Sequence, residues 1–122
     1  MFLEDKKLCD NNFLLYMDKK IEFINPEMID FSGCYVINEQ LKIKVPKIIN
    51  DYTRSITIHE LGHLYDYYIN DKVIENEDNA LLWELLYLEY SHNEELLLER
   101  IKKIKEDTTS PHYKSLQKIK RS

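Results

Sequence analysis

Apolar positions recur at mixed three- and four-residue steps over residues 3–24. This spacing places apolar side chains on one face of an α-helix, so we expect an amphipathic helix there, interrupted near residues 10–12. Asn25 followed by Pro26 is typical of a helix start, because asparagine caps the first turn and proline fits the first helical position. The pair predicts one short helical turn through Asp30.

A different pattern follows Gly33. Short segments rich in β-branched or aromatic residues occupy positions 34–37 and 41–45, and the second segment alternates apolar residues with lysine. A period of two residues is typical of a strand with one buried face. We therefore expect a β-hairpin that ends at Pro46.

Helical patterns return after the hairpin, each with a recognisable start. Asn50 or Asp51 can cap the first, acidic residues occupy the first turn of the second, and residues 91–94 have the spacing of a capping box. We expect helices over about 51–69, from about 76 to the break at 91–94, from there to about 107, and from 110 onward. This order predicts a single α+β domain over residues 1–122, mostly helical, with a small antiparallel sheet.

Composition narrows the class of protein. A chain of 122 residues, 43% hydrophobic, has the size of one domain, and a net charge of −5 argues against a surface that grips nucleic-acid phosphates. Apolar runs are too short to cross a bilayer, and residues 1–7 lack the pattern of a secretory signal. Cys9 and Cys34 form no CxxC pair, which favours reduced thiols. We expect a cytoplasmic protein with neither a nucleic-acid nor a membrane partner.

The segment His59-Glu60-Leu61-Gly62-His63 is an HExxH motif within a predicted helix. Residues four apart lie one turn apart on the same face, so both imidazoles can reach one metal ion while Glu60 stays beside it. Zinc accepts neutral imidazole nitrogen, and a glutamate beside it can take a proton from water that attacks a carbonyl. We predict His59 and His63 as zinc ligands and Glu60 as the general base. We expect Gly62 on the back of this helix, where it would let the sheet or another helix pack closely.

The motif supplies two ligands, so a third must come from elsewhere. The acidic candidates that follow are Glu75, Glu77, Asp78 and Glu84. In a tight antiparallel pair of helices, each residue advances 1.5 Å, so the second helix returns to the level of His63 after about as many residues as were spent leaving it. This geometry favours Glu84.

The stretch over residues 57–86 resembles the ImmA/IrrE-type regulatory metallopeptidases, in which HELGH precedes a helix with an E-x-E-A-N-x-F-A-x-x-L-L pattern. Here Asp78 replaces the first alanine, Leu81 the phenylalanine and Leu82 the second alanine. The same region is similar to thermolysin-like gluzincins and to anthrax lethal factor-like peptidases. The resemblance implies a minimal zincin and assigns the third ligand to Glu77. The interval between His63 and Glu77 is shorter than is usual in these families, so Glu84 remains an alternative.

Other side chains have weaker claims on the site. Asp66 could orient a ligand or be an ordinary exposed carboxylate. The tyrosines of residues 65–68 could stabilise an oxyanion, but packing is the preferred interpretation. We expect His92 and His112 to be solvent-exposed at helix starts, Trp83 to lie in the core, and the lysine-rich end to be a solvated face.

These patterns predict a zinc peptidase that hydrolyses a peptide bond in a specific protein or peptide substrate, held along the edge of the upstream strand. Two alternatives stay open. One is a catalytically degenerate metal-binding module that binds a protein partner in a regulatory or phage-type system. The other is a helical interaction protein with a fortuitous motif and no metal. Metal content measured beside activity separates the three.

Overall fold

The structure is a computed structural model that describes residues 2–120. Its elements in chain order are α1 (Phe2–Asp5), α2 (Asn11–Tyr16), β1 (Ile21–Ile24), the 3₁₀ helix η1 (Pro26–Phe31), β2 (Gly33–Ile37), β3 (Gln40–Pro46), α3 (Asp51–Asn70), α4 (Asp78–Tyr90), α5 (Glu94–Glu106) and α6 (Pro111–Lys120). The protein is α+β and mostly helical, as predicted.

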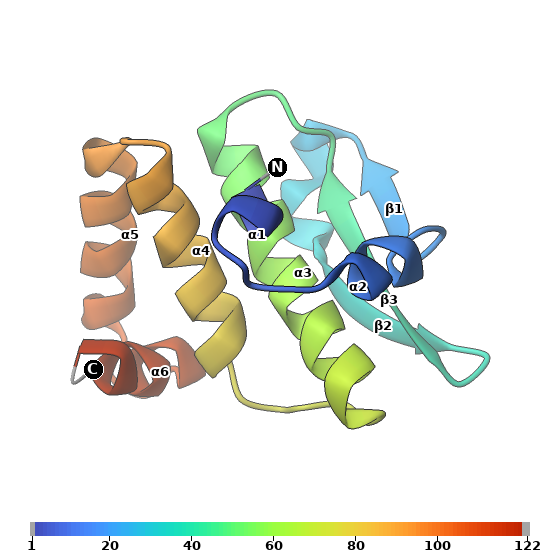
Figure 1. Cartoon of the computed structure of the whole chain (residues 1–122). Helices are drawn as coiled ribbons and strands as arrows, with labels where there is room; N and C mark the ends of the chain where they lie inside the picture. The colour runs from blue at the N-terminus through green and yellow to red at the C-terminus, as the bar shows by residue number, and fades with distance from the viewer. Residues whose placement is uncertain (1, 121–122) are drawn as a thin grey trace.

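Helix α3 occupies the middle of the molecule. The sheet packs on one side of it, and α4 lies against the other side with α5 beyond (Figure 1). Helix α6 runs across the lower ends of α4 and α5, and contacts both (Figure 1). The C-terminal helix is thereby brought to the end of α4 that follows α3 in the chain.

The sheet has the strand order β1-β3-β2. Strands β2 and β3 form the predicted hairpin, but β1 pairs with β3 in parallel, from Ile21 opposite Ile43 to Ile24 opposite Pro46. The prediction of a purely antiparallel sheet is therefore wrong, because a third strand adds a parallel edge.

Residues 3–24 do not form the long helix that their spacing predicts. Two short helices, α1 and α2, replace its first part, and Asp10 caps α2 by accepting a hydrogen bond from the backbone of Phe13 at 2.8 Å. The last part is β1. Its isoleucines satisfy a helical spacing, yet residues 21–24 are mostly β-branched or aromatic, and pairing with β3 satisfies their backbone groups.

The helices after the hairpin agree with the prediction. Asn50 caps α3, accepting from the backbone of Thr53 at 2.9 Å, while the Thr53 hydroxyl accepts in return from the Asn50 backbone at 3.1 Å. Helix α4 begins at Asp78, slightly later than expected. Asn93, rather than Ser91, caps α5.

The core lies between β3 and the helices. Apolar side chains of β3 that alternate with its lysines are buried against α3, and Trp83 of α4, 1% exposed, joins them as predicted. A smaller cluster links α4, α5 and α6 through Leu81, Leu85, Ile104 and Leu116. These two clusters fix α3 and α6 to the same intervening helix.

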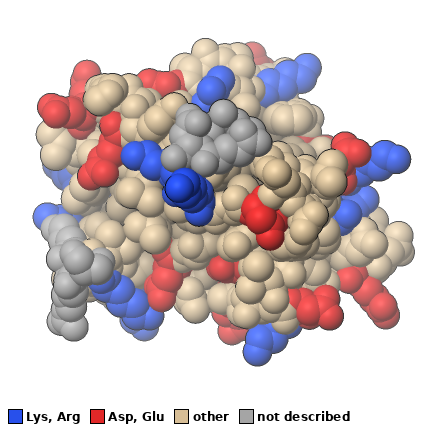
Figure 2. Space-filling view, in the orientation of Figure 1, with Lys and Arg blue, Asp and Glu red and all other residues tan. Residues whose placement is uncertain are grey.

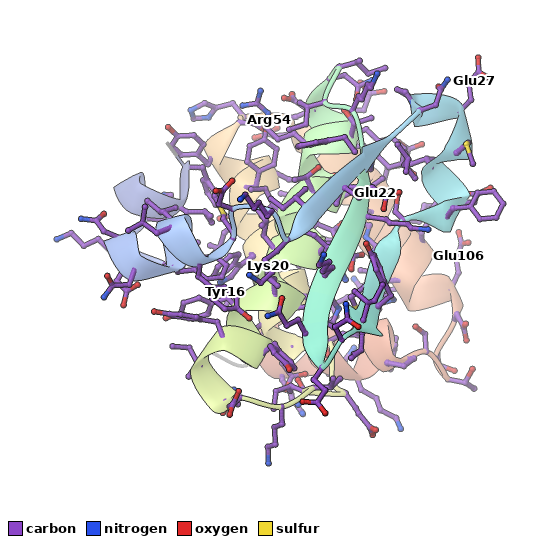
Figure 3. The ribbon with its side chains drawn as sticks, turned by 90° about the vertical axis from the view of Figure 1, so that its right-hand side faces the viewer. Tyr16, Lys20, Glu22, Glu27, Arg54 and Glu106 are labelled. Atoms are coloured by element: carbon purple, nitrogen blue, oxygen red, sulfur yellow. The ribbon has the colours of Figure 1, made fainter. Side chains whose placement is uncertain are left out.

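The opposite face of the sheet is open to solvent. Glu22 lies on this side (Figure 3) and is exposed, and the Tyr35 hydroxyl donates to its carboxylate at 3.4 Å. Lys20, just before β1, lies over the ring of Tyr16 at 4.7 Å. Polar and charged groups thus cover much of the side of the sheet that faces away from α3.

Charged side chains of both signs are interspersed over the face in Figure 2. Among residues 2–120, no helix combines the length and apolar character that crossing a bilayer requires.

Candidate metal centre

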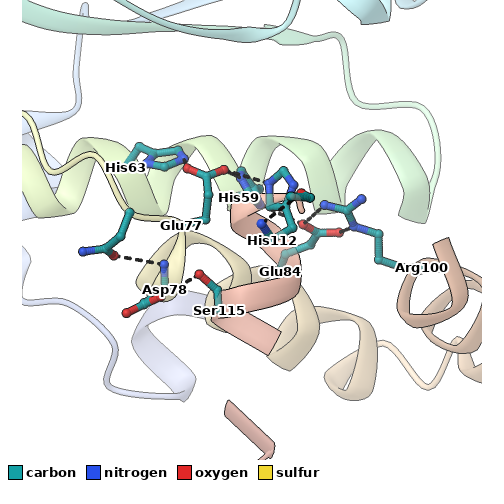
Figure 4. Close-up of polar contacts among 10 residues, drawn as sticks. His59, His63, Glu77, Asp78, Glu84, Arg100, His112 and Ser115 are labelled. Carbon is teal, nitrogen blue, oxygen red and sulfur yellow. Dashed lines mark hydrogen bonds and ion pairs between the residues drawn. The ribbon is translucent and has the colours of Figure 1, made fainter. Parts of the chain in front are cut away.

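Helix α3 presents the two motif histidines on the side that faces α4. His59 is buried, at 7% exposure, and its ring centroid lies 5.2 Å from that of His63. The two histidines lie on one helix, as predicted, and both contact the carboxylate of Glu77, the residue before the next helix (Figure 4). Of the two, His59 lines the cavity beside this cluster.

Gly62 brings the start of α4 against α3 between these histidines. A Cβ atom at Gly62 would lie 2.6 Å from the Cα of Ala80, closer than two such atoms can approach. The predicted close packing at Gly62 is thus confirmed, but the predicted position on the back of the helix is wrong, because Gly62 faces α4 on the same side of α3 as the histidines. Without a side chain there, the backbone of α4 can approach near enough for Glu77 to reach the imidazoles.

Glu77, immediately before α4, joins three imidazoles. Its Oε2 lies 2.8 Å from Nε2 of His63, and its Oε1 lies 3.1 Å from Nε2 of His59 and 2.7 Å from Nε2 of His112 (Figure 4). Donor atoms of His59, Glu77 and His112 all lie within 4.8 Å of one another, a group that could hold a metal ion. His63 is outside this group and contacts the same carboxylate through its other oxygen.

Glu84 contacts His59 from the opposite side of the ring. Its Oε1 lies 2.8 Å from Nδ1 of His59, shorter than the distance from Glu77 to the same residue. Arg100 of α5 donates through Nε to Oε2 of Glu84 at 2.6 Å and through Nη2 to Oε1 at 3.3 Å. The helix-pair geometry therefore identified a carboxylate that reaches His59, but only Glu77 reaches the Nε2 atoms of both motif histidines.

The contacts of His59 define how its two nitrogens are used. When Nδ1 donates its proton to Glu84, a metal ion could take the place of the proton that Nε2 shares with Glu77. Burial lowers the pKa of His59, but hydrogen bonds with Glu77 and Glu84 outweigh it and raise the pKa to about 9. Burial also opposes ionisation of Glu77, while hydrogen bonds from His112, His59 and His63 hold its pKa well below the usual range.

Glu60 lies beside this cluster at the edge of a cavity of about 660 Å³. The cavity lies between α3 and α5, and its lining includes His59, Glu77, Glu84 and His112. Burial raises the pKa of Glu60. Within residues 2–120, no hydrogen bond or ion pair holds its carboxylate, so it can accept a proton from a molecule in the cavity.

His112 is the residue of the cluster that sequence reasoning missed. The expectation of a solvent-exposed side chain is wrong: His112 contacts Glu77, and its side chain is 31% exposed. No local spacing links α6 to the HExxH motif, because the two are brought together only by packing on α4. One clue was Asp78, which departs from the ImmA-like pattern and binds α6 through Ser115.

The remaining candidates lie outside the cluster. Tyr65 packs against Phe13 and Trp83, and the Tyr67 hydroxyl donates to a backbone carbonyl of the hairpin turn at 2.9 Å. The preference for packing roles is confirmed for these two. Burial raises the pKa of Asp66, which is also hydrogen-bonded by Asn79 of α4, and His92 is exposed as expected.

Comparisons of the chain with protein-family models, with curated proteins and with solved structures found no significant match. The features of the chain that bear on function are therefore the HExxH motif and the cluster around Glu77.

Proposed function

We propose that the protein is a zinc-dependent peptidase whose centre includes His59, His63 and Glu77. The observation that carries the proposal is the contact of one carboxylate with Nε2 of both motif histidines, at 3.1 and 2.8 Å. Two imidazole nitrogens and a carboxylate are a donor set that zinc accepts. A carboxylate at the other ring nitrogen of a ligand, as Glu84 is for His59, fixes the ring and its tautomer.

The chain's own residues provide the proton transfers. When bound, zinc acidifies a water molecule and polarises a substrate carbonyl. Glu60 takes a proton from the water as its oxygen bonds to the carbonyl carbon. The carbon–nitrogen bond then breaks, and Glu60 returns the proton to the departing amine. Because burial raises the pKa of Glu60, its carboxyl is better suited to both accepting and returning a proton near neutral pH.

An extended peptide has a place beside these groups. Strand β2 is at the edge of the sheet, and such an edge can pair with the backbone of a bound peptide. Strand β2 contacts α3, and burial together with the charges of Glu60 and Glu77 raises the pKa of Cys34 on this strand. A side chain of the peptide would then enter the cavity between α3 and α5. Tyr52, Ile56 and Leu96 give that cavity an apolar part.

The test measures zinc content and cleavage of a fluorogenic peptide library by the full chain and its variants. The wild type should contain equimolar zinc and cleave a subset of peptides. Glu60→Gln should keep its zinc and lose about 10²–10⁴ in rate, whereas His63→Ala should lose zinc and activity together. Glu99→Gln is the matched control, since it removes a carboxylate from the same cavity away from the cluster. Full activity in Glu60→Gln would contradict the mechanism.

The contact of His112 favours a second candidate, a metal-binding module without catalysis. A third imidazole beside Glu77 could complete the coordination of a metal ion and leave no position for water. In that case the wild type would hold equimolar zinc, and no peptide of the library would be cleaved. If the wild type cleaves peptides and Glu60→Gln does not, the result favours the peptidase over the metal-binding module.

A further inference from the structure

We propose that His112 is a ligand of the same zinc centre, so that α6 closes it in the resting protein. The inference rests on the proposed function and assigns a role to a residue outside the HExxH motif and its following helix. It makes the C-terminal helix a part of the centre.

The first argument is the geometry around Glu77. Oε1 of this residue lies 2.7 Å from Nε2 of His112 and 3.1 Å from Nε2 of His59, and the two ring centroids are 5.4 Å apart. The three donor atoms form the group with mutual distances within 4.8 Å. His112 therefore approaches the centre from α6 as closely as His59 does from α3.

The second argument is that α6 is anchored where it presents His112. Asp78, next to Glu77, accepts a hydrogen bond from the Ser115 hydroxyl at 2.6 Å (Figure 4). Its other oxygen contacts Lys118 Nζ at 2.9 Å. Leu116, 1% exposed, holds the same helix in the cluster shared with α4 and α5. Two consecutive residues at the start of α4 thus hold successive turns of α6, which fixes the position of the imidazole.

The consequence concerns access to the metal. Zinc in structural sites has four protein ligands, whereas a catalytic site keeps one position for water. His59, Glu77 and His112 form the close group of donors, and His63, which contacts the other oxygen of Glu77, would be the fourth. A water molecule or a substrate carbonyl must then displace His112, and any peptide that loosens α6 from Asp78 would open the centre.

The decisive measurement is zinc binding by the ¹⁵N-labelled full chain, followed through the two-bond ¹H–¹⁵N correlations of the histidines. Nε2 of His112 should shift on saturation together with that of His59, while exposed His92 should not. In parallel, His112→Ala should lower zinc affinity by more than about 100-fold, beyond the effect of losing a group that only supports a ligand. His92→Ala should bind zinc as the wild type does.

Unchanged zinc affinity in His112→Ala would overturn the inference, whatever its peptidase activity. If that variant does not fold, Ser115→Ala keeps every donor but removes an anchor of α6. It should speed zinc transfer to a competing chelator at least several-fold relative to Lys114→Ala, an exposed position of the same helix. An unchanged transfer rate would also count against the inference. A wild type that binds no zinc would reject the proposed function as well, whereas a Glu60-dependent peptidase with unaltered affinity in His112→Ala would reject the role of His112 alone.

Discussion

Helix α3 brings two histidines to Glu77 and α6 brings one, but the two helices are held in place in different ways. Helix α3 lies between the sheet and α4, and its buried positions include Ile58, Leu61 and Leu64. Helix α6 packs on one side only, through Leu116 and the ion pair and hydrogen bond with Asp78. The comparison teaches that one carboxylate can join an imidazole from the most enclosed helix to an imidazole from a peripheral one. The second donor should be easier to remove.

The largest test of this difference truncates one core leucine in each helix. Leu64 is 0% exposed and Leu116 is 1% exposed, so both variants lose a fully buried side chain. Leucine-to-alanine changes in cores cost about 2–5 kcal/mol. We expect Leu64→Ala to lower the free energy of unfolding by an amount near the upper end of this range and to reduce protection from hydrogen exchange throughout the molecule. We expect the loss in Leu116→Ala to be near the lower end. Denaturant unfolding and hydrogen exchange measure both, and equal loss of protection in the two variants would contradict the comparison.

Removal of zinc should affect α6 more than α3. A ligand present at 100 times its dissociation constant stabilises the folded state by about 2.7 kcal/mol. Excess chelator should therefore lower the melting temperature, with hydrogen exchange rising first at residues 111–120. The chelated His63→Ala variant serves as control, because we expect it to hold no zinc. If excess chelator leaves the melting temperature of the wild type unchanged, the protein holds no metal tightly.

Glu84→Gln tests the support of His59 from within the core. The amide keeps the size of the side chain but removes the charge that faces Nδ1 of His59 and the guanidinium of Arg100. Loss of such a partner typically costs 10–100-fold in metal affinity, or about 1.4–2.7 kcal/mol. Competition with a chelator measures it. Glu89→Gln changes an exposed carboxylate of the same helix and should bind zinc normally.

Gly62→Ala tests the close approach of α3 and α4. Alanine favours a helix by up to about 1 kcal/mol over glycine, but its methyl group would meet the Cα of Ala80 at 2.6 Å. Overpacking of this kind costs about 1–3 kcal/mol. We expect a net destabilisation of about 1 kcal/mol, together with weaker zinc binding as Glu77 moves away. A more stable variant with unchanged affinity would contradict this role of Gly62.

How far the sequence predicts the molecule depends on the range of the interactions involved. The hairpin, α3 and the faces of His59 and His63 follow from periodicities within single elements, and all were predicted correctly. Residues 21–24 were not, because their isoleucine spacing suits a helix as well as a strand. The partner that decides between them is β3, which lies far along the chain.

The same distinction applies within the site. Glu77 and Glu84 both reach His59, but through different ring nitrogens, and that division depends on how α4 is rotated against α3. His112 was missed because its approach to Glu77 requires α6 to dock on α4 first. A short-range pattern could identify the HExxH motif. It could not identify His112, whose position depends on the packing of α3, α4 and α6.

The reciprocal cap formed by Asn50 and Thr53 has a consequence for how the chain can vary in length. It sets the first residue of α3 and hence the rotational phase of every side chain that follows. An α-helix turns by about 100° per residue. One residue inserted between Thr53 and His59 would therefore rotate His59 and His63 about the helix axis, so that they no longer face Glu77. One residue inserted among residues 47–49 would only lengthen a loop. The cluster around Glu77 therefore fixes the number of residues between the cap and His59, but it does not fix the length of the loop before Asn50.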